Sequence, residues 1–247
     1  MVATGQLPIP QITARRFGAR CLPALTDDAL YERTGVRVAF TGRAGGVSEG
    51  PYSSLNLGNH VGDDPASVER NRALVLEALD AADVPLVVPS QVHGEVVVEL
   101  DDASPEALDA AREAARAGAD ALVATVPGIA ALLCFADCVP VIVVSPTGRF
   151  AVAHAGWRGV ENGVAAKAVR ALARADAAEL GEDAASGYNV YVGPHIHASC
   201  FETGADVRKR FEDRFGSSCI PDERHVDLLE ALTVGLEEAG IDRARVA

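Results

Sequence analysis

Three apolar runs in the middle of the chain limit its possible folds most strongly. They cover residues 129–135, 139–144 and 150–153, and they are separated by Ala136-Asp137-Cys138 and by a Pro146-Thr147-Gly148 turn. Short runs of this kind, rich in β-formers and bounded by turns, are typical of buried strands. We therefore expect buried strands in the middle of the chain.

Helical patterns occur on both sides of these runs. Asp64-Pro65 and Ser104-Pro105 each place a capping residue before a proline at the first helical position. Capping and apolar spacing together predict five helices, over residues 65–79, 105–115, 160–174, 206–215 and 226–239. Two further segments are rich in β-formers and predict strands, at residues 36–41 and 189–192. No repeat or linker divides the chain, so we expect one domain over residues 1–247.

Composition excludes several classes of function. Hydrophobic residues make up 49% of the chain and charged residues 23%, which is enough to form a large core. The net charge of -13 repels phosphate backbones and anionic lipids, so neither nucleic acid nor membrane is an expected partner. No apolar run approaches the roughly 18 residues of a membrane span, and no signal peptide is recognisable, which predicts a cytoplasmic protein. Five scattered cysteines favour free or metal-bound thiols over disulfides.

Three polar side chains lie where apolar runs end or are interrupted. The run before His93 is a separate one, whereas Cys138 and His154 border the runs in the middle of the chain. His93 lies in Ser90-Gln91-Val92-His93-Gly94, Cys138 follows Asp137, and His154 begins His154-Ala155-Gly156-Trp157-Arg158-Gly159. Thiolates and imidazoles are metal ligands, but a single histidine at a strand end is more often a hydrogen-bonded structural residue. The three residues also lack the short paired spacing of structural zinc sites. From the residues alone, both interpretations stay open.

Five separated motifs, taken together, resemble the YfiH family of purine nucleoside enzymes, which were earlier described as polyphenol oxidases. Besides the two histidine motifs and Ala136-Asp137-Cys138-Val139-Pro140, they are Thr41-Gly42-Arg43-Ala44-Gly45-Gly46-Val47-Ser48 and Leu55-Asn56-Leu57-Gly58. The resemblance implies an α+β fold in which layered β-sheets are flanked by helices. It also implies that His93, Cys138 and His154 bind zinc.

The activities implied by the resemblance act on purine nucleosides, and phosphate is the second substrate of the phosphorolysis. They comprise phosphorolysis of adenosine, inosine or methylthioadenosine, and deamination of adenosine. Three protein ligands leave a fourth zinc position open for water or substrate. In this hypothesis Asp137, Cys138 and Arg43 are catalytic, and Asp137 is a candidate proton shuttle for an attack on the purine C6.

Substrate contacts are expected from four further residues. Arg158, together with Arg43, is a candidate for binding phosphate, because guanidinium pairs well with phosphate oxygens. Gly46 would let the backbone approach an anion, and Asn56 and Gln91 offer donors and acceptors to the base or ribose. The alternative roles are an ion pair for Arg43 and a capped turn for Asn56.

Two features depart from the family pattern. His195 and His197 occur where relatives usually carry small residues, and only Cys200 of a usual Cys-Cys pair is retained. The sequence ends at Ala247, about where relatives continue into a final strand and a Ser-x-Arg motif. We therefore expect any substrate contact from that segment to be missing.

Other functions use the same residues. Cys138 could be the nucleophile of a cysteine hydrolase that acts on cell-wall precursors, with His93 or His154 as its base and Asp137 or Gln91 as helper. Copper in place of zinc would give a weak polyphenol oxidase, although His195 and His197 are a single His-x-His pair. A non-enzymatic partner of the cell-wall machinery is a third class. The sequence identifies no protein partner.

Overall fold

A five-stranded sheet forms the centre of the protein. The computed structural model describes residues 5–247. The strands lie in the order β10 (Asn189–Val192), β8 (Val139–Val144), β9 (Phe150–Ala155), β6 (Ala121–Ala124) and β5 (Val97–Leu100). Only β5 and β6 pair in parallel, and the other neighbours are antiparallel. Because both faces of this sheet are covered, β6 and β8 are buried almost throughout.

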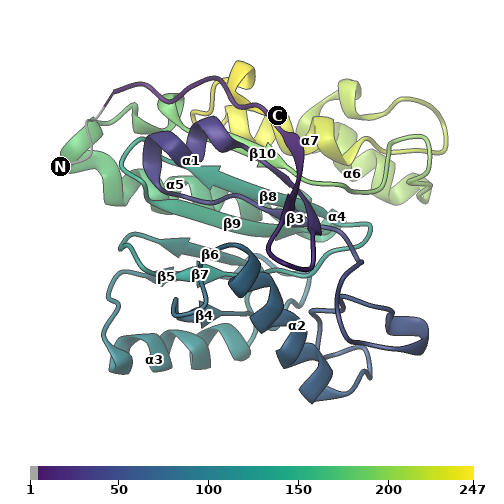
Figure 1. Cartoon of the computed structure of the whole chain (residues 1–247). Coiled ribbons are helices and arrows are strands. Elements are labelled where there is room, and N and C mark those ends of the chain that lie inside the picture. Colours follow the sequence, from purple (N-terminus) through teal and green to yellow (C-terminus); the bar gives the residue numbers. More distant parts are fainter. Residues whose placement is uncertain (1–4) are drawn as a thin grey trace.

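Helices and a smaller sheet cover the two faces (Figure 1). One face packs against α5 (Val164–Leu180), α6 (Ala205–Phe215) and α7 (Leu228–Glu237), and its core includes Leu172, Phe211 and Leu236. The other face packs against α3 (Pro105–Arg116) and the parallel pair of β4 (Leu86–Val87) and β7 (Ala130–Ala131). The α+β fold with layered sheets and flanking helices is therefore confirmed.

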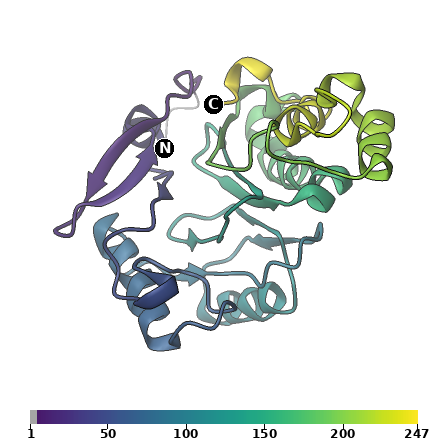
Figure 2. The same ribbon diagram turned by 90° about the vertical axis from the view of Figure 1, so that its right-hand side faces the viewer.

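A hairpin and a short helix form the N-terminal part of the fold. β1 (Thr13–Phe17), β2 (Leu22–Thr26) and β3 (Phe40–Thr41) make an antiparallel sheet that lies to one side of the central sheet (Figure 2). Asp27 caps α1 (Asp28–Thr34) and accepts a hydrogen bond from the Tyr191 hydroxyl at 2.8 Å. This bond connects the hairpin region to β10.

Several predicted elements agree closely with the structure. Strands β8 and β10 have the predicted bounds, and α2 (Pro65–Ala78) begins at the proline after its Asp64 cap. The predicted helix over residues 160–174 is instead divided into α4 (Trp157–Asn162) and α5, because Gly163 adopts the left-handed conformation with φ of 75°. Helix α1 and strands β1, β2, β4, β5 and β6 are not predicted from the sequence.

Two predicted strands are shorter than expected. β7 has two residues instead of the predicted 129–135, because the backbone N–H and C=O of Cys134 bond to the side chain of Gln91 and not to a strand. β3 has two residues instead of 36–41, since the Val38 carbonyl accepts from the Thr26 hydroxyl outside the ladder. Short 3-10 turns complete the fold at Gly50–Tyr52, Ala184–Gly187, Ser217–Cys219 and Arg243–Arg245.

No helix within residues 5–247 combines the length and the apolar character that crossing a bilayer requires.

Candidate metal centre

Antiparallel pairing of β8 and β9 brings Cys138 and His154 together. Cys138 directly precedes β8, and in the register Pro140 lies opposite His154 while Val139 lies opposite Ala155. The two strands therefore deliver a thiol and an imidazole to the same end of the central sheet. His154 is buried, with 4% of its surface exposed, and Cys138 is half-buried.

His93 reaches the same place from a tight turn. Its φ of 57° lies in the left-handed region, which costs a non-glycine residue about 1 to 2 kcal/mol. The backbone N–H groups of Val92, His93 and Gly94 all donate to the carboxylate of Asp120, at 3.2, 3.0 and 2.7 Å. These bonds hold the turn in the conformation that places the His93 ring against His154, with 4.8 Å between the ring centroids.

The three predicted ligands converge on one point. One ligand atom from each of His93, Cys138 and His154 lies within 4.8 Å of the others. Tetrahedral neighbours at zinc-ligand distances would be about 3.6 Å apart, so an ion would draw the atoms together by a small side-chain movement. Exposure increases from His154 through Cys138 to His93. The site therefore opens on the His93 side, and a thiolate with two imidazoles suits zinc or copper chemically.

Hydrogen bonds set the charge state of the buried pair. Burial by itself would lower the pKa of His154, but bonds to Asp120 and Cys138 outweigh it and raise this pKa to about 9. Burial would raise the pKa of Asp120, yet His154 and the Gly94 and Val92 N–H groups lower it. Without a metal, Asp120 is therefore an anion that stabilises a doubly protonated His154, and an ion bound at Nε2 would displace the proton of that nitrogen.

Gln91 and Asn56 use their amides within the protein. Gln91 donates to the Cys134 carbonyl at 2.6 Å and accepts from the Cys134 N–H at 2.8 Å. Asn56 donates to Asp63 and the Gly58 carbonyl and accepts from the Gly58 N–H, so it forms the capped turn that was the alternative interpretation. Both residues shape loops next to the motifs, and their expected substrate contacts stay predictions.

Arg43 and Gly46 belong to the loop that follows β3. The Arg43 guanidinium donates to the Ser53 carbonyl at 3.1 and 3.3 Å and remains exposed. A Cβ at Gly46 would be 2.1 Å from the Ser54 carbonyl oxygen, so this glycine allows a close approach within the loop itself. Anion binding by these two residues stays a prediction.

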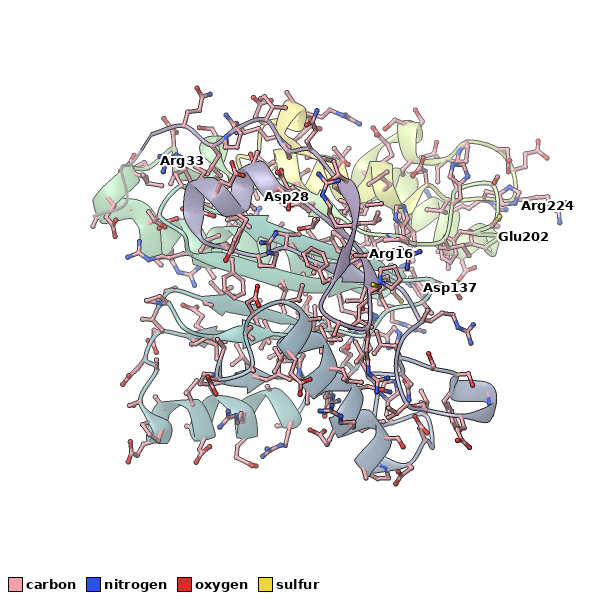
Figure 3. The ribbon with its side chains drawn as sticks, in the orientation of Figure 1. Arg16, Asp28, Arg33, Asp137, Glu202 and Arg224 are labelled. Atoms are coloured by element: carbon pink, nitrogen blue, oxygen red, sulfur yellow. The ribbon has the colours of Figure 1, made fainter. Side chains whose placement is uncertain are left out.

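Asp137 and Arg158 are both exposed, and they lie one residue before Cys138 and four residues after His154 in the sequence. Asp137 precedes Cys138, and its side chain lies at the surface, at the end of the sheet that is on the right in Figure 3. Its backbone carbonyl accepts from the Ile196 N–H at 2.9 Å. The Arg158 guanidinium lies over the Trp157 ring, 4.2 Å from its centroid, on the helix that follows His154. Their expected roles in proton transfer and phosphate binding stay predictions.

The additional histidines are not part of the ligand cluster. Among residues 5–247, only one group of three or more His, Cys, Asp or Glu side chains is close enough together to hold an ion. This group is His93, Cys138 and His154. His195 bonds the Gly193 carbonyl, and His197 bonds Ser199 within one turn. Since the Ile196 N–H bonds Asp137, this turn forms part of the rim next to the Asp137-Cys138 segment.

Asp120 is the residue that sequence reasoning missed. Its side chain is fully buried and accepts from His154 Nδ1 at 2.8 Å in addition to the three backbone groups. The only signal in the sequence is an aspartate that directly precedes an apolar run, residues 121–124. That signal does not identify a partner, because the partners lie 26 to 34 residues away.

Comparison with known proteins supports the fold and the motifs. A family model described as multi-copper polyphenol oxidoreductase laccase matches residues 37–247. The crystal structure of the Bacillus licheniformis hypothetical protein YfiH has a TM-score of 0.76 at 26% identity and covers 90% of this chain and 84% of that one. The structure of YlmD from Geobacillus stearothermophilus has a TM-score of 0.74 at 30% identity, with 94% and 87% covered.

Curated relatives carry the name purine nucleoside phosphorylase. The protein from Pseudomonas aeruginosa is 39% identical over 177 residues, which are 71% of this chain and 64% of that protein. The protein from Bacteroides thetaiotaomicron is 32% identical over 232 residues, or 89% and 84% of the two chains. The matches to the relatives from Pseudomonas aeruginosa and Corynebacterium glutamicum span 64% and 52% of those proteins' lengths.

Proposed function

Since this chain belongs to the YfiH family of purine nucleoside phosphorylase and polyphenol oxidase-like proteins, we propose that it is a zinc-dependent purine nucleoside phosphorylase with its metal centre at His93, Cys138 and His154. The convergence of one thiol and two imidazoles within 4.8 Å carries this proposal. Deamination of adenosine is proposed as a second activity of the same site. A zinc ion bound there supplies Lewis acidity and an activated water molecule.

In phosphorolysis, a phosphate oxygen forms a bond to C1′ of the ribose while the bond from C1′ to the purine nitrogen breaks. The purine then leaves with a proton. Arg43 and Arg158 are the proposed phosphate-binding groups, since both are exposed and lie within the family motifs, Arg43 in the loop after β3 and Arg158 in α4. Asp137 is the proposed proton shuttle, because it is exposed directly beside the ligand Cys138.

The first test combines metal analysis with turnover. We expect protein purified without added metal to contain about one zinc ion per chain and to release hypoxanthine from inosine only with phosphate. His93→Ala and Cys138→Ala should lose both the metal and the turnover, whereas Cys21→Ala, which changes an exposed thiol of the hairpin turn, should keep both. Unchanged metal content and rate in both ligand variants would dismiss this function.

One observation favours the cysteine hydrolase as a second candidate. The Cys138 thiol interacts with His154, and His154 in turn bonds Asp120, which is the order of groups that activates a nucleophilic cysteine. A chelator distinguishes the two functions. Removing the metal should silence the phosphorylase, whereas a hydrolase should survive chelation and lose its activity to a thiol alkylator.

A further inference from the structure

A single buried carboxylate holds two of the three metal ligands. Asp120 Oδ1 accepts from the His93 N–H at 3.0 Å and from His154 Nδ1 at 2.8 Å. Its Oδ2 accepts from the Val92 N–H at 3.2 Å and from the Gly94 N–H at 2.7 Å. An ionised carboxylate has about four acceptor sites. The four donors, which come from the turn around His93 and from His154, therefore use all of them.

On the His93 side, Asp120 determines the backbone conformation. His93 has a φ of 57°, and three successive N–H groups of this turn point to the same carboxylate. Among the described residues, these three N–H groups have no other hydrogen-bond acceptor. A change at Asp120 therefore releases the turn that carries the His93 ring.

On the His154 side, Asp120 determines which ring nitrogen is free. An ionised carboxylate only accepts hydrogen bonds, so Nδ1 of His154 carries a proton and donates to it. The Asp120 carbonyl also accepts from the His154 backbone N–H at 2.7 Å, which fixes both ends of the residue. Only Nε2 is then left to bind an ion.

We propose that Asp120 is the positioning residue of this metal centre, which orients His93 through its backbone and His154 through its ring at the same time. The inference rests on the proposed function, because it concerns the affinity of the same centre. Carboxylates that orient a ligating histidine typically contribute about 10- to 100-fold to metal affinity.

Asp120→Asn tests this role with little change in shape. Both carboxylate oxygens of Asp120 accept hydrogen bonds. In either orientation, the asparagine would therefore place an amide N–H group against groups that are themselves donors. We expect its zinc affinity, measured by competition with a chromophoric chelator, to fall about 10- to 100-fold. We expect the spectrum of the Co²⁺-loaded protein to change as well, because the ligands are reoriented.

Asp176→Asn is the matched control. Asp176 is equally buried and accepts from Thr147, Arg149 and Tyr188, but these partners lie around the opposite ends of β8 and β9. The Asp176→Asn variant should have lower thermal stability than the wild-type protein and the same zinc affinity. If Asp120→Asn behaves like this control, with lower stability and unchanged affinity, the positioning role is wrong.

A measurement on the unchanged protein covers the case in which Asp120→Asn does not fold. Long-range ¹H–¹⁵N NMR of the zinc-loaded protein should show His154 protonated at Nδ1 and bound through Nε2. Zinc bound through Nδ1 would overturn the inference. A wild-type protein that binds no zinc would dismiss the proposed function together with this role, whereas normal wild-type binding with an unaffected Asp120→Asn dismisses the role of Asp120 alone.

Discussion

Gly156 leaves no space for a side chain beside the proposed ligands His93 and Cys138. A Cβ there would be 2.9 Å from His93 Cδ2 and 3.1 Å from Cys138 Sγ. Its φ of -64° and ψ of 169° suit alanine equally well, so the backbone would tolerate the change. The requirement for glycine at this position is therefore steric and concerns the ligands directly.

Gly156→Ala should weaken metal binding without unfolding the protein. The added methyl group pushes the His93 ring and the Cys138 sulfur apart, and we expect zinc affinity to fall on the order of tenfold in a competition titration. Gly187→Ala is the control, because its Cβ would meet only Pro146 Cγ, at 3.8 Å. Equal affinity in both variants would contradict the geometry of the site.

The five free cysteines differ in their expected reactivity. Burial raises the pKa of Cys219 to about 11, and its thiol donates to the Gly216 carbonyl at 3.1 Å. A raised thiol pKa means that the protonated form persists, so at pH 8 about one Cys219 in a thousand is a thiolate. Brief iodoacetamide treatment followed by mass spectrometry should label the exposed Cys21 and Cys200 and leave Cys219 unmodified. Labelling of Cys219 at the rate of Cys21 would show that its environment is open.

At the scale of elements, capping and periodicity predicted five helical segments, but neither α1 nor the break between α4 and α5. The apolar spacing of residues 160–174 continues through Gly163, whose φ of 75° ends α4 and starts α5. The break allows α4 to cover the end of β9 next to His154, whereas α5 packs along the sheet. Spacing alone cannot show this, because a glycine is compatible with a helix as well as with a turn.

Two glycines of neighbouring helices should respond oppositely to alanine. Gly163→Ala puts a side chain at positive φ and should lower the free energy of unfolding by about 1 kcal/mol, although its Cβ would make only an ordinary contact with Ala166 Cβ at 3.9 Å. Gly235→Ala lies inside α7, where the new Cβ would make an ordinary contact with Phe215 at 3.8 Å. This variant should gain about 0.5 to 1 kcal/mol. Urea denaturation measures both values, and a stabilising Gly163→Ala would refute the conformational argument.

At the scale of the whole molecule, the proposed metal centre connects segments that are distant in sequence. His93 precedes β5, Cys138 precedes β8, and His154 lies in β9, so an ion held by all three crosslinks both halves of the central sheet. Ligands that bind only the folded state raise its stability by mass action.

Zinc should therefore raise the melting temperature of the protein. At about 100 times the dissociation constant the gain is about 2.7 kcal/mol, which corresponds to about 5 to 10 °C for a chain of this size. Calorimetry with zinc, and then with a chelator, should show a reversible shift that is absent in His93→Ala. A shift of equal size in that variant would place the bound metal elsewhere.

The sequence determined the elements whose signals are local. The apolar runs of β8 and β10, the Asp64 cap of α2 and the periodicity of α6 each depend on neighbouring residues, and the structure has them as predicted. The motifs also led, through the resemblance, to His93, Cys138 and His154 as a ligand set. Each of these signals can be read within a segment of a few residues.

Only the tertiary structure decided how these segments meet. Convergence of the ligands depends on the β8 and β9 register and on a turn whose three N–H groups bond Asp120, which lies 26 to 28 residues away. The one local signal of Asp120, its position before an apolar run, does not identify its partners, and Gln91 and Asn56 have local motifs but internal bonding partners. The physical reason is that a hydrogen-bond acceptor is identified by the donors around it, and those donors come together only when the chain has folded.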